Sequence, residues 1–292
     1  MTAALTLAAA AKINLTLHIT GRRDDGYHNL DSLIGFTDVA DVLTFRAADT
    51  TTLRVTGAEA AGIDAADDNL VVRAARLMQT HLGVSAGMDI ELEKNIPVAA
   101  GLGGGSADAA ATVAGCMALW GSSTSDLISD QTLASDLGAD VPVCRYGRAA
   151  RISGIGETIT PTPNWPTAWL VLANPRIPLS TADVFRAFDG KFAAAGDTTF
   201  DGADYSSFTA YIAERENCLT STALAIAPII GDVLDGLGAL SGCSLARMSG
   251  SGPTCFGLFG TKEEADVGQQ DLSQTHPDWW VRASPLVIGS PS

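Results

Sequence analysis

Hydrophobic and polar residues alternate strictly along residues 11–20, AKINLTLHIT. In an extended chain the apolar residues face one side, and the polar residues, beginning with Lys12 and Asn14, face the other. The alternation therefore predicts a half-buried strand with an unusual polar face. Further strands are predicted over residues 33–45 and 51–56.

Apolar residues recur at helical spacing across residues 70–82 and predict an amphipathic helix. Asp67, Asp68 and Asn69 can cap its start, and Gly83 fits its end. Alternation returns over residues 88–92 and predicts a strand that leads into a glycine-rich loop. That loop opens an alanine-rich helix, expected at about Ala107 to Trp120.

The segment over residues 153–166 is rich in Gly, Pro and Thr, which favours a domain boundary near residue 160. We therefore expect two domains, 1–160 and 161–292. Beyond the boundary the pattern predicts strands over 168–173, 244–248, 254–260 and 279–283, helices from 180, across 207–240 and from 262, and a loop over 195–205. Strands and helices alternate in both halves, and no internal repeat is visible.

Composition narrows the class of protein. Hydrophobic residues make up 46% of the 292 residues and charged residues 17%, which is typical of a globular protein and excludes global disorder. The net charge of −15 disfavours nucleic acid and anionic membrane surfaces as partners. Five cysteines without a C-x-x-C pair, and the lack of a signal-like or membrane-spanning segment, favour a cytoplasmic protein with reduced thiols.

The strongest candidate site is the glycine-rich loop from Pro97 to Ser106. Consecutive glycines let backbone N–H groups converge, and the following helix start adds positive potential, so the loop suits phosphate oxygens. It is neither a Walker A loop nor G-x-G-x-x-G, because Ser106 holds the third glycine position. The alternative is a turn or close helix–strand packing. Asp108, in the first helical turn, is interpreted as mainly structural.

A second glycine loop, Ser249-Gly250-Ser251-Gly252, lies between two predicted strands and is open to a simpler interpretation as a hairpin turn. Lys12 is also open to interpretation as an edge or snorkelling residue, and Asp140 as a helix cap or turn former. We expect Pro142 to hold Val141 in an extended conformation. Phosphoryl transfer to an alcohol needs a carboxylate to accept the hydroxyl proton and a cation to stabilise charge, and Lys12 and Asp140 fit those roles.

Together these motifs resemble one enzyme family across nearly the whole chain. They are residues 11–15 (AKINL), 21–28 (GRRDDGYH), 97–111, 138–142 (GADVP) and 249–252 (SGSG). The chain resembles the superfamily of galactokinase, homoserine kinase, mevalonate kinase and phosphomevalonate kinase, and within it the kinases that act on 4-diphosphocytidyl-2-C-methyl-D-erythritol. The resemblance implies an α+β fold: an N-terminal α/β ATP-binding domain, a C-terminal ferredoxin-like domain and an active site in the cleft between them.

The resemblance also implies catalytic roles. Asp140 matches the general base that takes the proton of the 2-hydroxyl of the substrate, 4-diphosphocytidyl-2-C-methyl-D-erythritol. Lys12 matches its partner, which keeps Asp140 ionised and stabilises the attacking oxygen. Asn14 is expected to bond the substrate.

Four further matches concern the cytidine part of that substrate. Tyr27 and His28 match the pair that recognises cytosine by stacking and hydrogen bonding. Thr181 and Phe185 match the stretch that closes over the cytidine, with Phe185 on the opposite ring face, although an ordinary core position is the alternative for Phe185.

ATP and Mg²⁺ are the cofactors that the resemblance implies. Asn69 and Lys94 would lie near the nucleoside, and no carboxylate cluster in the sequence identifies magnesium ligands. Many relatives have serine where this chain has Ala107. The expected ATP-binding residues of the loop are Pro97, Gly101, Leu102, Gly103, Gly104, Gly105 and Ser106.

The sequence therefore predicts a monomeric or weakly dimeric, ATP-dependent kinase of the isoprenoid precursor route that does not use mevalonate. Its alternatives are another alcohol kinase of the superfamily and a catalytically silent nucleotide-binding homologue. The presence of both Lys12 and Asp140 argues against the silent homologue.

Overall fold

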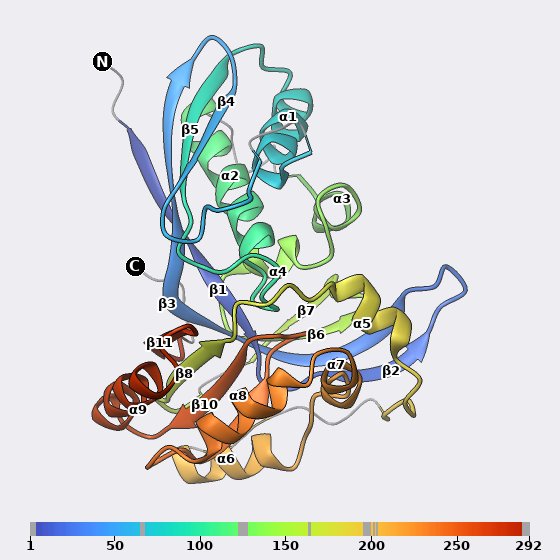
Figure 1. The fold of residues 1–292 in the computed structure, drawn as a ribbon. Helices are drawn as coiled ribbons and strands as arrows, with labels where there is room; N and C mark the ends of the chain where they lie inside the picture. The colour runs from blue at the N-terminus through green and yellow to red at the C-terminus, as the bar shows by residue number, and fades with distance from the viewer. Residues whose placement is uncertain are drawn as a thin grey trace. The chain divides into compact units, whose positions relative to one another are not determined.

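The computed structural model describes residues 4–64, 68–121, 128–162, 165–194, 200, 202 and 204–287. Its strands are β1 (Leu5–Asn14), β2 (His18–Arg22), β3 (His28–Ala48), β4 (Thr52–Thr56), β5 (Gly87–Glu93), β6 (Ala150–Gly154), β7 (Thr158–Pro161), β8 (Trp169–Asn174), β9 (Leu245–Met248), β10 (Cys255–Phe259) and β11 (Trp280–Pro285). Its helices are α1 (Leu70–Leu82), α2 (Gly104–Trp120), α3 (Asp130–Asp136), α4 (Val141–Tyr146), α5 (Thr181–Ala187), α6 (Tyr205–Ala213), α7 (Thr220–Ile226), α8 (Ile229–Gly238) and α9 (Lys262–Thr275) (Figure 1).

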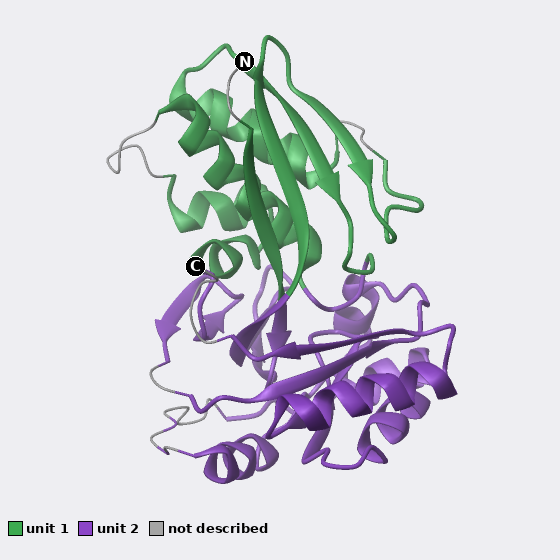
Figure 2. Ribbon diagram, turned by 90° about the vertical axis from the view of Figure 1, so that its left-hand side faces the viewer, with its two compact units in different colours: residues 1–11, 39–98, 103–146 green, residues 12–38, 99–102, 147–292 purple. Residues whose placement is uncertain are grey.

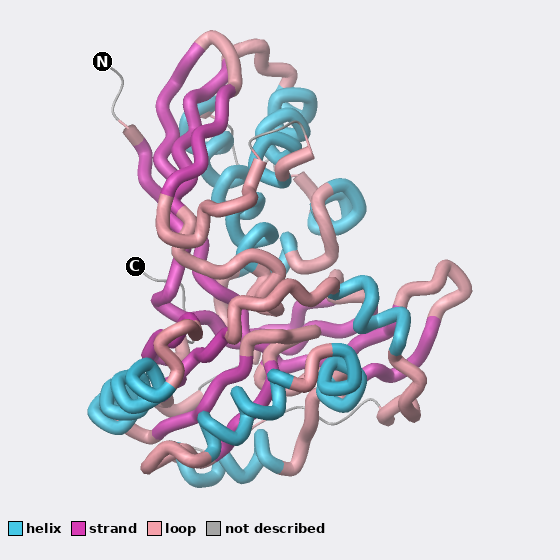
Figure 3. Tube along the Cα trace, in the orientation of Figure 1, coloured by secondary structure: helices cyan, strands magenta, loops and turns pink. Residues whose placement is uncertain are grey.

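The chain forms two compact units, which are not consecutive halves of the sequence. Unit 1 comprises residues 1–11, 39–98 and 103–146, and unit 2 comprises residues 12–38, 99–102 and 147–292 (Figure 2). Both units contain helices and strands (Figure 3). The boundary at residue 160 stays a prediction.

One sheet has the strand order β4-β5-β3-β6-β7, with β1 and β2 also paired to β3. The long strand β3 contributes to both units: residues 30–34 pair with β6, and residues 42–48 pair with β5. The predicted strands over 33–45, 51–56 and 88–92 are confirmed as β3, β4 and β5.

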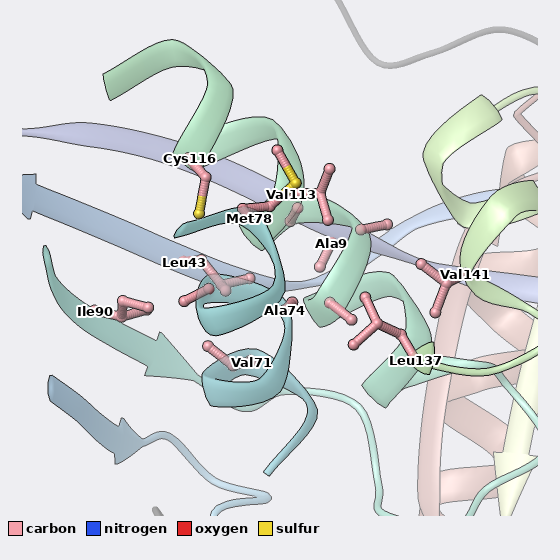
Figure 4. Close-up of a cluster of buried hydrophobic side chains, with 14 of the residues drawn as sticks. Ala9, Leu43, Val71, Ala74, Met78, Ile90, Val113, Cys116, Leu137 and Val141 are labelled. Carbon is pink, nitrogen blue, oxygen red and sulfur yellow. The ribbon is translucent and has the colours of Figure 1, made fainter. Parts of the chain in front are cut away.

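Unit 1 has its own hydrophobic core, in which α1 and α2 pack together. Leu43 of β3, Ile90 of β5, Met78 of α1 and Val113 of α2 are all almost fully buried in it (Figure 4). The alanine and glycine content of α2 has a packing reason. A Cβ added at Gly115 would lie 2.8 Å from the ring of Phe45, so the helix lies close to β3.

Unit 2 contains an antiparallel sheet in the order β11-β8-β10-β9. Helix α8 packs against β8, β9 and β10, and α9 packs against β8, β10 and β11. The helices α5 to α8 lie between β8 and β9 along the chain, and α9 lies between β10 and β11. This is the β-α-β-β-α-β order of a ferredoxin-like domain, so the predicted α+β fold with such a C-terminal domain is confirmed.

The strand predicted over 11–20 differs from the structure in two respects. It is interrupted, because β1 ends at Asn14 and β2 begins at His18. Its polar side is also buried, with Lys12 4%, Asn14 2% and Thr16 1% exposed. The prediction of a half-buried strand is therefore wrong, because hydrogen bonds inside unit 2 satisfy these polar groups.

The remaining predicted elements of the second half are confirmed as β8 to β11, α5, α9 and the run from α6 to α8. Most of the loop predicted over 195–205, and the predicted cap residue Asp67, lie outside the described residues. No helix in the described ranges has the length and hydrophobicity that crossing a bilayer requires.

Candidate functional site

The first glycine loop ends where α2 begins, three residues earlier than the sequence predicts. Gly103 precedes the helix with φ +64° and makes no side-chain capping bond. The N–H groups of the first helical turn, at Gly104, Gly105 and Ser106, have no partners within the helix. A 17-residue helix adds partial positive charge at this end, so these N–H groups can bind an anion.

The glycines of this loop have two different explanations. Gly101 has φ +72°, and a Cβ there would lie 2.6 Å from the carbonyl oxygen of Ser249, so the fold itself requires glycine. A Cβ at Gly104 would meet its neighbours at 3.4 Å or more, and one at Gly105 would meet only Leu70 within 4 Å, at 3.4 Å. Packing does not require glycine at these two positions. Without a Cβ, both residues leave their backbone N–H groups open to close approach by a phosphate.

Alanine substitutions separate these two explanations. We expect Gly105→Ala to leave the melting temperature unchanged or slightly raised, because alanine favours a helix by roughly 0.5–1 kcal/mol over glycine, and to weaken ATP binding. Gly101→Ala is expected to destabilise the fold by at least about 1–3 kcal/mol, the usual cost of a strained backbone conformation. Thermal unfolding without nucleotide and calorimetric titration with ATP measure both effects. If Gly105→Ala binds ATP as tightly as the wild type, no ATP phosphate binds beside Gly105.

Lys12 and Asn14 lie side by side at the end of β1. The Lys12 ammonium donates to Asn14 Oδ1 at 3.0 Å, and Asn14 Nδ2 donates to Ser32 Oγ at 2.8 Å. The backbone N–H of Lys12 donates to the carbonyl of Leu102 at 2.8 Å, which connects β1 to the first glycine loop. Lys12, Asn14 and Ser32 thus form a buried chain of hydrogen bonds.

The second glycine loop is the connection between the antiparallel strands β9 and β10, so the hairpin interpretation is correct for its backbone. It also contacts the first loop. Ser249 Oγ accepts from the N–H of Asn14 at 3.1 Å and donates to the carbonyl of Gly101 at 3.1 Å. One hydroxyl therefore connects β1, the first loop and the second loop within unit 2.

Asn217 is a residue that sequence reasoning missed. Its Nδ2 donates to the carbonyls of Met248 and Gly250, each at 2.8 Å, and it is 5% exposed. It holds the second loop from a segment that carries no recognisable motif, and no local pattern in the sequence indicates this.

His28 and Phe185 come together in unit 2, with ring centroids 5.7 Å apart. Phe188, which the sequence analysis did not single out, packs edge-on against His28 at 5.9 Å. Burial lowers the pKa of His28 below its ordinary value, and the positive charge of Arg22 adds to this, so the imidazole is neutral at pH 7. A neutral ring offers one donor and one acceptor, as recognition of a base edge needs. Tyr27, by contrast, is 61% exposed.

Thr181 begins α5, whose N-cap is Ser180. The hydroxyl oxygens of Thr181 and Ser251 are 2.8 Å apart, so a hydrogen bond connects α5 to the second glycine loop. The segment with Phe185 is thereby held against the same loop that contacts Asn14.

Asp140 lies in unit 1, half-buried, directly before α4. The N–H of Val141 donates to the carbonyl of Gly138 at 3.0 Å, and the Asp140 carbonyl accepts from Cys144. The expectation that Pro142 extends Val141 is wrong, because Val141 is the first residue of α4. Proline is tolerated in a first helical turn, where its missing N–H would have no helical partner.

Asn69 and Lys94, predicted near the nucleoside, use their side chains within the protein. Asn69 caps α1: its Oδ1 accepts from the N–H of Val71 at 3.0 Å, and its Nδ2 donates to the carbonyl of Asp64 at 2.9 Å. Lys94 is 4% exposed and paired with two carboxylates. Pro97 and Leu102 are also buried. The nucleotide-binding roles of these four residues stay predictions.

Within the described residues, no group of three or more His, Cys, Asp or Glu side chains is arranged to hold a metal ion. Magnesium in kinases is commonly held by one or two carboxylates together with substrate phosphates. A loop that binds nucleotide phosphates would fit that arrangement, because the phosphates would then supply most of the ligands of the ion.

Comparison with known proteins gives consistent results for both parts of the chain. The sequence profile "GHMP kinases N terminal domain" matches residues 69–148, and "GHMP kinases C terminal" matches residues 208–278. A homoserine kinase structure from Cytophaga hutchinsonii covers 100% of this chain, which covers 98% of that structure, with a TM-score of 0.72. At 17% identity it shows the fold alone.

Closer relatives cover nearly the full length. The 4-diphosphocytidyl-2-C-methyl-D-erythritol kinase of Paramagnetospirillum magneticum is 46% identical over 97% of this chain and 98% of its own, and that of Rhodospirillum rubrum is 47% identical over 96% and 92%. A crystal structure of 4-(cytidine 5'-diphospho)-2C-methyl-D-erythritol kinase is 32% identical, with a TM-score of 0.75, over 98% of this chain and 100% of that one. The chain therefore belongs to the 4-diphosphocytidyl-2-C-methyl-D-erythritol kinase family of GHMP kinases, a family of small-molecule phosphotransferases.

Proposed function

We propose that this enzyme transfers the γ-phosphoryl group of ATP to the 2-hydroxyl of 4-diphosphocytidyl-2-C-methyl-D-erythritol. The observation that carries the proposal is the 46% identity to a kinase of that name over 97% of the chain. The cytoplasmic location and the monomeric or weakly dimeric state expected from the sequence stay predictions.

The proposed phosphate site is the start of α2. The N–H groups of Gly104, Gly105 and Ser106 bind the ATP phosphates, and Gly101 and Gly103 give the loop its backbone path. Bound together with ATP, Mg²⁺ would supply neutralisation of the phosphate charge. Asn69 and Lys94 support ATP binding indirectly. Asn69 caps α1, and Lys94 pairs with Asp108 of α2.

Transfer is direct and in line. The 2-hydroxyl oxygen forms a bond to the γ-phosphorus while the bond from that phosphorus to ADP breaks, and no phosphoenzyme forms. The Asp140 carboxylate takes the hydroxyl proton. The Lys12 ammonium stabilises the negative charge on the attacking oxygen, and Asn14 donates to the substrate.

The aromatic group of unit 2 binds the cytidine. Phe185 and exposed Tyr27 stack on the base, and the neutral His28 ring bonds its edge. Thr181, bonded to Ser251, holds the start of α5 in place.

Tyr27→Ala is expected to raise KM for the cytidine substrate with little change in kcat. Loss of one stacked base commonly costs roughly 1–3 kcal/mol, or about 5- to 150-fold. Steady-state kinetics with saturating ATP measures this effect, with Phe192→Ala as a control because Phe192 is also an exposed aromatic residue. An unchanged KM would show that Tyr27 does not stack on the base.

The proposed activity is tested by ADP release in a coupled assay with ATP and Mg²⁺. The acceptors, supplied one at a time, are 4-diphosphocytidyl-2-C-methyl-D-erythritol, homoserine, mevalonate and galactose. Turnover with the cytidine compound alone is expected. Turnover with another acceptor would make this a different alcohol kinase of the superfamily, and ATP binding without any turnover would make it a silent homologue.

A further inference from the structure

A buried group of three charged side chains lies beneath the start of α2. We call Asp41, Lys94 and Asp108 the buried triad. They are 0%, 4% and 3% exposed, all within unit 1. The Lys94 ammonium donates to Asp41 Oδ2 and, at 2.8 Å, to Asp108 Oδ2. A Cβ at Gly104 would lie 3.6 Å from both Asp41 Oδ2 and the Lys94 ammonium, so the triad is adjacent to the first residue of α2.

Asp41 fixes the chain on the side that enters the loop. Its Oδ1 accepts from the backbone N–H groups of Asn95 at 2.6 Å and Ile96 at 2.9 Å. The Asn95 side chain donates to the carbonyl of Ala40 at 3.2 Å. The segment that follows β5 is therefore bound to β3 by the Asp41 carboxylate and the Asn95 side chain.

Asp108 fixes the chain on the side that leaves the loop. It lies in α2, five residues after Gly103, and its Oδ2 accepts from Lys94. Lys94 precedes the loop and Asp108 follows it, so this ion pair joins the two ends of the loop. The ammonium thus sets the position of the helix start relative to the end of β5.

Stability alone does not explain the triad. Replacing a buried ion pair or triad with apolar residues of similar size is often neutral or stabilising. The triad has two carboxylates for one ammonium, and Asp108 Oδ1 is buried without a hydrogen-bond partner. Burial raises the pKa of Asp108 to about 7, against the opposing effect of the Lys94 ammonium. Asp41, with two N–H donors besides Lys94, is better compensated.

We propose that the buried triad is a positioning device that holds the N–H groups of Gly104, Gly105 and Ser106 in the arrangement that binds the ATP phosphates. The proposal rests on the proposed function, because it assumes that α2 binds the nucleotide at its start. It gives Lys94 a role other than direct contact with the nucleoside. The charged bond between Lys94 and Asp108 is directional, whereas apolar packing would let the helix start shift.

The test compares two replacements of one carboxylate. Asp108→Asn keeps an acceptor for Lys94, whereas Asp108→Leu removes it at similar size. We expect Asp108→Leu to weaken binding of a non-hydrolysable ATP analogue by roughly 10- to 100-fold, the same size of effect as loss of a residue that orients a metal ligand. Asp108→Asn is expected to retain most of the affinity. Calorimetric titration without acceptor alcohol gives both values, and Asp266→Leu on α9, which removes an exposed ion pair, is the matched control.

A fully uncharged variant keeps the test decisive if Asp108→Leu fails to fold. Asp41→Asn/Lys94→Met/Asp108→Leu leaves an acceptor for the N–H groups of Asn95 and Ile96 and is expected to melt no lower than the wild type. We expect it to bind the analogue weakly and to raise KM for ATP, with KM for the acceptor unchanged.

A stable uncharged variant with wild-type affinity would overturn the positioning role. Loss of affinity in Lys94→Met together with normal affinity in Asp108→Leu would instead make Lys94 a direct ligand. If the wild type itself does not bind the analogue, the proposed function fails. If wild type and variants bind equally, only the positioning role fails.

Discussion

Replacing Asp140 by asparagine is expected to lower kcat by roughly 10²- to 10⁴-fold, the usual contribution of a general base. Asparagine has nearly the same shape but cannot accept the hydroxyl proton. Asparagine also suits a turn before a helix, so the backbone bonds at Val141 and Cys144 are expected to persist. KM for both substrates should change little, because the lost interaction acts in the transition state.

The matched control for this result is Asp136→Asn. Asp136 is an exposed carboxylate at the end of α3, four residues before Asp140, and its Oδ1 accepts from Ser135 Oγ. It is expected to turn over like the wild type. Calorimetric titration with ATP distinguishes the two roles of Asp140: loss of ATP binding together with turnover in Asp140→Asn would make Asp140 a structural residue.

The elements of the fold that could be predicted depend on local patterns. The helix over 70–82 has a regular apolar face, a capping Asn69 and a terminal Gly83 with φ +64°. Each of these signals lies within a few residues of the structure that it predicts. The sequence predicts the start of α2 three residues too late, because glycines ordinarily disfavour a helix, whereas Gly104 and Gly105 are its first residues.

The contacts that hold the candidate site could not be predicted in this way. Asp41 and Lys94 are 53 positions apart, so no periodicity connects them. Arg247 also connects segments that are far apart in the sequence. Its buried guanidinium donates to the carbonyls of Leu15, Ile212 and Arg215, and burial lowers the pKa of Arg247 to about 10. Such residues satisfy backbone groups of distant segments, and a single sequence carries no signal of that pairing.

The polar face of β1 is buried for a reason that alternation does not show. Alternation predicts which residues share a face, and that prediction is correct for Lys12 and Asn14. It does not predict whether a polar face meets solvent or the interior. In unit 2 the partners of Asn14 are Ser32 and Ser249, which come from later parts of the chain. A buried polar face is costly to assemble, because each of its polar groups needs a hydrogen-bond partner from another part of the chain.

Lys12→Met is the second change with a large expected effect. Methionine keeps the unbranched side chain and removes the ammonium, so we expect kcat to fall by roughly 10²- to 10³-fold, the usual cost of losing one group that stabilises transition-state charge. Asn14 keeps its bonds to Ser32 and Ser249 but loses the Lys12 donor at its buried Oδ1, so the free energy of unfolding is expected to fall by about 1–3 kcal/mol. A rise in KM for the acceptor with unchanged kcat would instead make Lys12 a binding residue.

The double variant Lys12→Met/Asp140→Asn tests whether the two side chains serve one step. Groups that act together on a single transition state are strongly non-additive, because removal of either already disables the step. We therefore expect the double variant to be little slower than the slower single variant. If the two losses multiply, Lys12 and Asp140 act independently, and the charge that Lys12 stabilises does not arise from the proton transfer to Asp140.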